Sequence, residues 1–158
     1  MRLCTIRDGG SLSGGLVVGD ATAVRLNDVL QAVASGLPSD IPTLLMSWDA
    51  VQGPLREAVL HANTAGMPTF DVTQWHAPVP RPGKIICVGR NYAEHAKETG
   101  NEVPDQPILF TKHATCVVGP RDEVVRPREV QDLDYEAELA VVIGRRCKNL
   151  ARDGALDV

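Results

Sequence analysis

The sequence lacks the features that define several large classes of protein. No apolar run approaches the roughly 20 residues that a membrane-spanning helix needs. The N-terminal stretch 1–8 lacks the hydrophobic centre of a signal peptide. Lys and Arg number 16 against 20 Asp and Glu, for a net charge of −4, so the basic excess typical of nucleic-acid-binding proteins is missing. We therefore expect a cytoplasmic protein that binds neither membranes nor nucleic acids.

The cysteines and histidines also lack the spacing of a metal or disulfide framework. There are four of each, with no C-x-x-C pair and no H-x-x-x-H pair. Zinc is therefore not expected. We expect the cysteines to be small core residues: Cys4, Cys87, Cys116 and Cys147.

The chain has the length of one ordinary domain or two small ones, and 44% of its 158 residues are apolar. Proline is concentrated in residues 78–83, where it removes backbone donors and restricts its neighbours. We interpret 78–83 as a linker between a small N-terminal α+β domain, 1–77, and a second domain, 84–158. Within the first domain, Pro54 is expected in the first turn of a helix that ends before Gly66.

The segment 132–143 separates its residues by parity. Its odd positions are apolar, and its even positions begin with four acids, Asp132, Asp134, Glu136 and Glu138. This alternation predicts a strand with one apolar and one acidic face. The acidic face has two interpretations, a solvated surface or a divalent-cation site. Residues two apart on a strand are separated by about 6.6 Å, so one ion could recruit two neighbouring acids and would need a third ligand from another segment.

A strand, a turn and a short helix are expected at 84–98. Lys84–Val88 is a continuous apolar run after its first residue, and Asn91 is a plausible helix cap. His95 and Glu98 then stand three residues apart on one helical face. A carboxylate beside an imidazole can make a general base, although an exposed helix could carry the same pair incidentally.

Other polar residues near this helix could bind an anionic substrate. Two interpretations are open for Arg90, Asn91 and Tyr92: donors to a carboxylate or keto-acid oxygen, or a helix cap with a solvated arginine. Lys112 ends a second expected strand, 107–112, where it could face an anion or solvent.

Three blocks, 84–95, 109–112 and 134–144, closely resemble the fumarylacetoacetate hydrolase family in the same order. The resemblance implies a β-rich α+β catalytic fold, usually a homodimer, that uses Mg²⁺ or Mn²⁺, or Ca²⁺ in some members. It implies that Glu136 and Glu138 are two of three carboxylate metal ligands and that His95 and Glu98 are the dyad that activates water. It places the substrate-binding residues at Arg90, Asn91, Tyr92 and Lys112.

The resemblance also implies a reaction class, hydrolysis of a carbon–carbon bond in a β-diketo or 2-oxo acid such as an acylpyruvate. Alternatives within the family are decarboxylation of oxaloacetate-type acids and isomerisation of dienoate diacids in aromatic catabolism. The family's third metal ligand, an Asp in a later Asn-Asp block, does not occur here. We therefore expect the 158-residue chain alone to be inactive. A non-catalytic interaction or assembly module is the alternative from another class.

Overall fold

The computed structural model describes residues 1–98 and 100–158 and has the mixed α+β fold expected from the sequence. Contacts divide the chain into two compact units, residues 1–79 with 119–158 and residues 80–118. The elements of the first unit are β1 (Leu3–Asp8), β2 (Ser11–Val17), β3 (Thr22–Arg25), α1 (Leu26–Ala32), α2 (Ile41–Met46), α3 (Trp48–His61), β4 (Thr69–Asp71), η1 (Val72–Gln74), β5 (Trp75–His76) and η3 (Arg152–Gly154). Those of the second are β6 (Ile85–Gly89), α4 (Ala93–Glu98), β7 (Ile108–Lys112) and η2 (Ala114–Cys116). The expected catalytic stretch 84–158 is thus distributed over both units, and the domain division at 78–83 stays a prediction.

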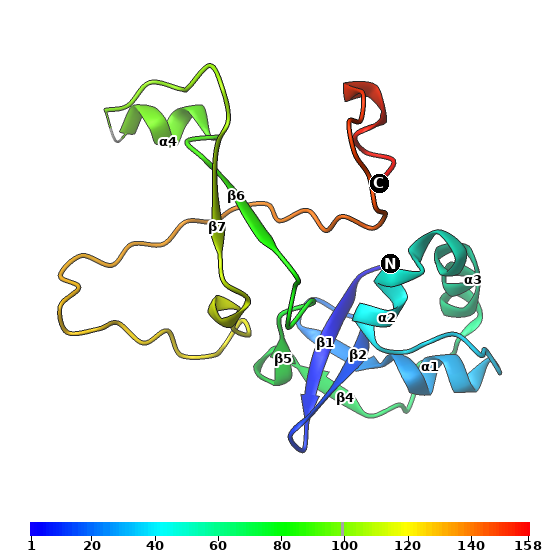
Figure 1. The fold of residues 1–158 in the computed structure, drawn as a ribbon. Helices are drawn as coiled ribbons and strands as arrows, with labels where there is room; N and C mark the ends of the chain where they lie inside the picture. Colours follow the sequence, from blue (N-terminus) through cyan, green and yellow to red (C-terminus); the bar gives the residue numbers. More distant parts are fainter. Residues whose placement is uncertain (99) are drawn as a thin grey trace. The chain divides into compact units, whose positions relative to one another are not determined.

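The first unit is built on a five-stranded antiparallel sheet with the order β4-β3-β2-β1-β5. Helices α1, α2 and α3 gather beside this sheet in Figure 1, and their apolar side chains pack on one of its faces. Leu16 and Val24 project from the sheet into this core, where they meet Leu30 of α1 and Leu55 of α3. Burial of these side chains is the main stabilising contribution to the unit.

The opposite face of the sheet carries a smaller cluster that includes Cys4, Ile6 and Phe70. Burial raises the pKa of the Cys4 thiol to about 11, so this residue is an inert core cysteine as expected. The expectation is wrong for Cys116 and Cys147, which are exposed. All four cysteines are free.

Helix α3 begins six residues before Pro54, so the predicted position of this proline in the first turn is wrong. The apolar stripe extends upstream through Val51, which is buried in register with Leu55 and Ala58. That packing offsets the backbone hydrogen bond that a proline removes inside a helix. No helix in the described parts of the chain is long and apolar enough to cross a membrane.

The second unit consists mainly of the antiparallel hairpin β6–β7, which confirms the two strands predicted at 84–88 and 107–112. Gly89 pairs with Ile108 at one end of the hairpin, and Ile85 pairs with Lys112 at the other. Helix α4 lies at the Gly89 end, as Figure 1 shows. Ile86, Leu109 and other apolar side chains of the two strands are exposed. The hairpin therefore has the apolar composition of buried strands, although these side chains are not buried.

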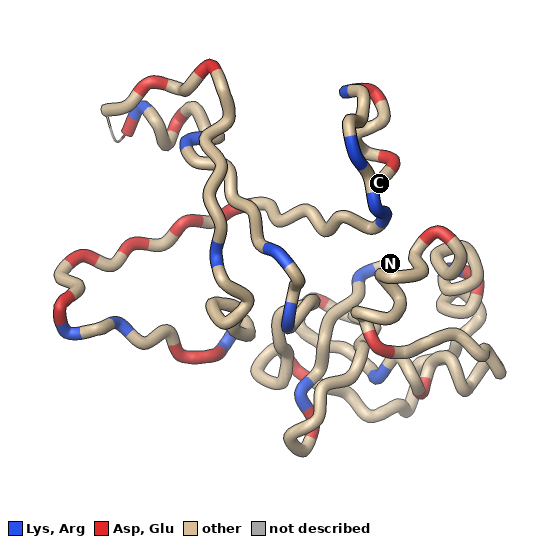
Figure 2. Tube along the Cα trace, in the orientation of Figure 1, with Lys and Arg blue, Asp and Glu red and all other residues tan. Residues whose placement is uncertain are grey.

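The strand predicted at 132–143 is not formed. This stretch has no regular secondary structure, and its apolar odd positions are exposed, with 87% of Tyr135 and 72% of Val141 accessible to solvent. A strand is stabilised by hydrogen bonds to a neighbouring strand, and alternation of side chains cannot supply that neighbour. Figure 2 shows Asp and Glu spaced along this extended course of the chain.

Candidate functional site

The turn between β6 and α4 contains three of the predicted substrate-binding residues. Directly after Gly89, Arg90 has a φ of 55°, a left-handed conformation that costs a non-glycine residue about 1–2 kcal/mol. The amide of Ala96 then donates to the carbonyl of Tyr92 at 3.1 Å. Helix α4 therefore follows Tyr92, and the predicted cap at Asn91 is wrong by one residue. Arg90 and Asn91 both belong to the turn.

This turn forms one wall of a cavity of about 230 Å³. Opposite walls come from the loop that leads to β7. The lining residues are Val88, Gly89, Arg90, Asn91, Val103, Pro104, Asp105 and Pro107. Its lining combines apolar residues with an arginine, an asparagine and an aspartate, and it is an open hollow, smaller than the roughly 300–1,000 Å³ of most ligand pockets.

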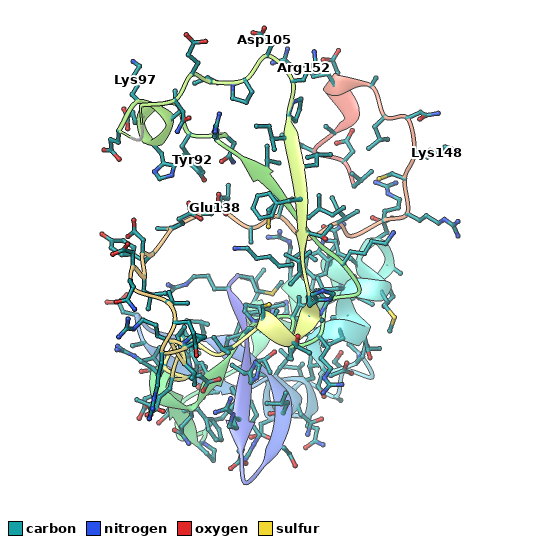
Figure 3. All side chains as sticks on the ribbon, turned by 60° about the vertical axis from the view of Figure 1, so that its left-hand side comes forward. Tyr92, Lys97, Asp105, Glu138, Lys148 and Arg152 are labelled. Carbon is teal, nitrogen blue, oxygen red and sulfur yellow. The ribbon has the colours of Figure 1, made fainter. Side chains whose placement is uncertain are left out.

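Asp105 was not among the candidates from the sequence. It lies on the loop between α4 and β7, as its label in Figure 3 shows. Its only signal in the sequence is the pair of prolines, Pro104 and Pro107, which shapes a turn just before the strand. Its carboxylate adds a negative charge to the lining that also contains Arg90 and Asn91, two of the residues expected to donate to an anionic substrate.

The candidate dyad, His95 and Glu98, lies on α4 as expected. The two side chains are three residues apart on the helix, and both are exposed. Ala96 is fully buried and anchors the opposite side of the helix. Figure 3 places Tyr92 and Lys97 around the same short helix. The helix therefore offers an imidazole and a carboxylate to solvent immediately after the turn that lines the cavity.

Lys112 is not brought to this cavity. It pairs with Ile85, whereas the cavity lies at the Gly89 end of the hairpin, four residues along β6. Four strand residues span about 13 Å. The ammonium of Lys112 lies 6.0 Å from the ring centroid of Phe110, which is the position of a cation–π contact.

Glu136 and Glu138, the predicted metal ligands, lie in the first unit on the exposed stretch 132–143. Figure 3 shows Glu138 on this extended part of the chain. Across residues 1–98 and 100–158, no three His, Cys, Asp or Glu side chains are grouped closely enough to hold a metal ion. The structure therefore provides two of the carboxylates that the resemblance implies and does not assemble a complete ligand set.

Ion pairs attach the C-terminal part of the first unit to its N-terminal part. Arg7 of β1 binds Asp122, and Asp49 of α3 binds Arg145. No local pattern predicts these partners, because the two residues of each pair are separated by about a hundred positions in the sequence. The local sequence Gly119-Pro120-Arg121-Asp122 is typical of a turn, and a hydrogen bond of 3.2 Å from the Asp122 amide to the Gly119 carbonyl closes it.

Residues 84–158 match the family model described as fumarylacetoacetate (FAA) hydrolase C-terminal. The human mitochondrial oxaloacetate tautomerase FAHD2A is 42% identical over 127 residues, which make up 80% of this chain and 40% of that protein. The mitochondrial oxaloacetate tautomerase fahd2 of Xenopus laevis is 48% identical over 81 residues, 51% of this chain and 25% of that protein. A putative HpcE protein from Mycobacterium smegmatis has a similar solved structure, with a TM-score of 0.54 and 29% identity over 80% of this chain and 41% of that one.

This chain thus spans about 40% of the length of the human relative that it matches. The family model covers the β6–α4 turn, the candidate dyad and both candidate metal ligands. The similarity to the relatives extends beyond this region into the N-terminal part of the chain, because it includes 80% of its residues. Residues 84–158 thus match the fumarylacetoacetate hydrolase family, as the resemblance in the sequence predicted.

Proposed function

We propose that this chain carries the 2-oxo-acid-binding turn and the acid–base dyad of a divalent-metal-dependent enzyme. The single observation that supports this proposal best is the cavity of about 230 Å³ at the β6–α4 turn, lined by Arg90 and Asn91. An arginine can bind a carboxylate through two parallel hydrogen bonds, and an amide can donate to an adjacent keto oxygen. These are the recognition groups that a 2-oxo acid requires.

The dyad would move a proton at the carbon next to the keto group or on an attacking water. In this proposal His95 accepts the proton, and the negative charge of Glu98 one turn along the helix stabilises the imidazolium that results. The left-handed Arg90 supports a functional role for the turn, since strained backbone is concentrated at sites where a side chain must be held in one direction.

Glu136 and Glu138 are the residues that would hold the metal. Their carboxylate oxygens fit Mg²⁺ or Mn²⁺, and Ca²⁺ accepts the same donors. When bound, such an ion supplies Lewis-acid stabilisation of negative charge on the keto-acid oxygens. Two carboxylates leave most of the coordination shell to other ligands, so we expect weak binding by the 158-residue chain and no turnover by this chain alone.

The names of the relatives favour oxaloacetate as a first substrate to test, with keto–enol tautomerisation as the reaction. Hydrolysis of an acylpyruvate carbon–carbon bond and decarboxylation of oxaloacetate remain candidates, because each develops negative charge on the same keto-acid oxygens. The expected homodimer and cytoplasmic location also stay predictions. A non-catalytic assembly role is the competing function.

The test uses a chimaera in which residues 84–158 replace the matching segment of the human relative, assayed with Mn²⁺ on oxaloacetate and on an acylpyruvate. His95→Gln should lower kcat by about 10²–10⁴-fold if His95 is the general base. His113→Gln in the same chimaera, at an exposed histidine of the transplanted segment, serves as the matched control for folding. Glu136→Gln should weaken Mn²⁺ binding, whereas Asp132→Asn should not. Full activity of the His95→Gln chimaera would refute the assigned role, and a folded but inert unmodified chimaera would favour the assembly function.

A further inference from the structure

We propose that Arg7 is a positioning residue that fastens the segment carrying Glu136 and Glu138 to the N-terminal sheet. Its partner is Asp122, which opens that segment, and the two residues are 115 positions apart in the sequence. The inference rests on the proposed metal-binding role of the two glutamates. The inference assigns a role to the sheet of the first unit that neither the family model nor the names of the relatives assign.

The contact between the two side chains is bidentate. Arg7 Nη1 donates to Asp122 Oδ1 at 3.0 Å, and Arg7 Nη2 donates to Asp122 Oδ2 at 3.0 Å. Two parallel charge-assisted hydrogen bonds fix direction as well as distance, which a single ion pair does not. The carboxylate of Asp122 is about a quarter exposed, so the contact is partly shielded from water.

Asp122 also closes the turn from which the segment begins. Its Oδ2 accepts a hydrogen bond of 2.7 Å from the amide of Gly119. Gly119 is buried against β5, and a Cβ added there would lie only 2.9 Å from the carbonyl oxygen of Trp75. Since β1 and β5 are neighbours in the sheet, the turn is held by two adjacent strands, through Arg7 and through Trp75.

A second attachment lies on the other side of the two glutamates. Arg145 Nε is 3.4 Å from Asp49 Oδ2 near the start of α3, and Gly144 lies beside Trp48. The Arg145 and Asp49 side chains are 52% and 60% exposed, so this pair should contribute little. Glu136 and Glu138 thus lie between a bidentate attachment at Asp122 and a single, more exposed ion pair at Arg145.

Fastening the ends of a flexible segment reduces the number of conformations that it can adopt. An ion that binds Glu136 and Glu138 must order this stretch of chain, and the loss of conformational entropy weakens the binding. When the contact with Arg7 already restricts the segment, the ion has to remove less conformational entropy on binding. Loss of the Arg7 contact should therefore weaken metal binding although Arg7 itself contacts no metal.

The test compares amide hydrogen exchange across 119–148 and Mn²⁺ affinity in the complete 158-residue chain and its variants. Arg7→Met should speed exchange in that stretch and raise the Kd for Mn²⁺ about two- to fivefold, the size expected from one surface charge pair. Arg7→Lys keeps the positive charge but cannot make two parallel hydrogen bonds to Asp122. It should therefore restore the exchange rates and the Kd only in part. Arg7→Asp combined with Asp122→Arg restores the charge pair but removes the acceptor of the Gly119 amide, so it should recover only part of the effect.

Arg56→Met, which removes an exposed arginine from α3, is the charge-matched control and should change neither measurement. Unchanged exchange in Arg7→Met would overturn the attachment, and faster exchange with an unchanged Kd would overturn its role in metal binding. Absence of Mn²⁺ binding by the unmodified chain would instead contradict the proposed metal ligands. The exchange rates would still decide whether Arg7 fastens the segment.

Discussion

Two parts of the first unit share a strand-like pattern but have opposite surroundings. In β1, the consecutive residues Cys4, Thr5 and Ile6 are all buried, and the strand has hydrogen-bonded neighbours on both sides. In the stretch 132–143, alternate apolar residues such as Tyr135 and Val141 are exposed, and no sheet includes them. The difference shows that alternation identifies which side chains share a face, whereas strand formation also needs a neighbouring edge.

The comparison is tested most directly by substituting one leucine in the core that packs on the sheet and one in the exposed stretch. Leu55 on α3 has no exposed surface, so Leu55→Ala should lower the free energy of unfolding by about 2–5 kcal/mol. Leu133→Ala in the exposed stretch should change it by less than about 0.5 kcal/mol, because 61% of Leu133 is already accessible to solvent. The urea midpoint of each variant measures the effect.

Leu60→Ala is the control within α3, since this leucine is 74% exposed in the same helix as Leu55. It separates loss of core packing from loss of helix propensity. A loss of stability in Leu133→Ala as large as that in Leu55→Ala would show that the stretch 132–143 is buried in solution and would contradict the structure.

The sequence predicted most reliably what depends on neighbours along the chain. The strands β6 and β7, the helix that carries His95 and Glu98, and the turn at Gly119 all follow from local patterns and are present. The sequence could not predict long-range pairing. The failed strand at 132–143 depends on a partner edge, and the contact of Arg7 with Asp122 depends on how the chain returns to the sheet. The left-handed Arg90 was also missed, because a non-glycine residue gives no sign of a positive φ.

Two glycines, one in the sheet and one beside the exposed stretch, test the same comparison with a smaller expected change in stability. A Cβ added to Gly14 in β2 would lie 2.0 Å from the backbone oxygen of Ser39, a clash that neither backbone can relieve without moving. Gly14→Ala should therefore destabilise the protein by about 1–3 kcal/mol. At Gly144 the nearest atoms belong to Trp48 at 3.8 Å, so Gly144→Ala should be tolerated. Thermal unfolding of both variants tests the contrast, and equal midpoints would contradict the tight packing around β2.

The smallest expected change in stability concerns Asp122, which connects β1, through Arg7, to the segment that contains 132–143. The hydrogen bonds from Arg7 and, next, from the amide of Gly119 lower the pKa of this carboxyl from 3.8 to about 2. Because the pKa is lower in the folded state, the unfolded chain binds more protons between these two values. The contribution of the contact to stability is therefore complete above about pH 3.8 and is lost as the pH falls toward about 2.

The difference between the urea midpoints of the unmodified chain and Asp122→Asn isolates this contribution from those of other acids. Asp40 and Asp71, whose pKa values are lowered by hydrogen bonds from Thr43 and Thr73, titrate in both proteins and cancel. The difference should be present at about pH 6 and should shrink at about pH 2.5. Arg7→Met should show the same loss, and combining it with Asp122→Asn should add little, because both substitutions remove one interaction. A difference that stays constant with pH would mean that protonation of Asp122 does not weaken its contact with Arg7, and the attachment of the segment would then rest on packing at Gly119 and on the Arg145–Asp49 pair.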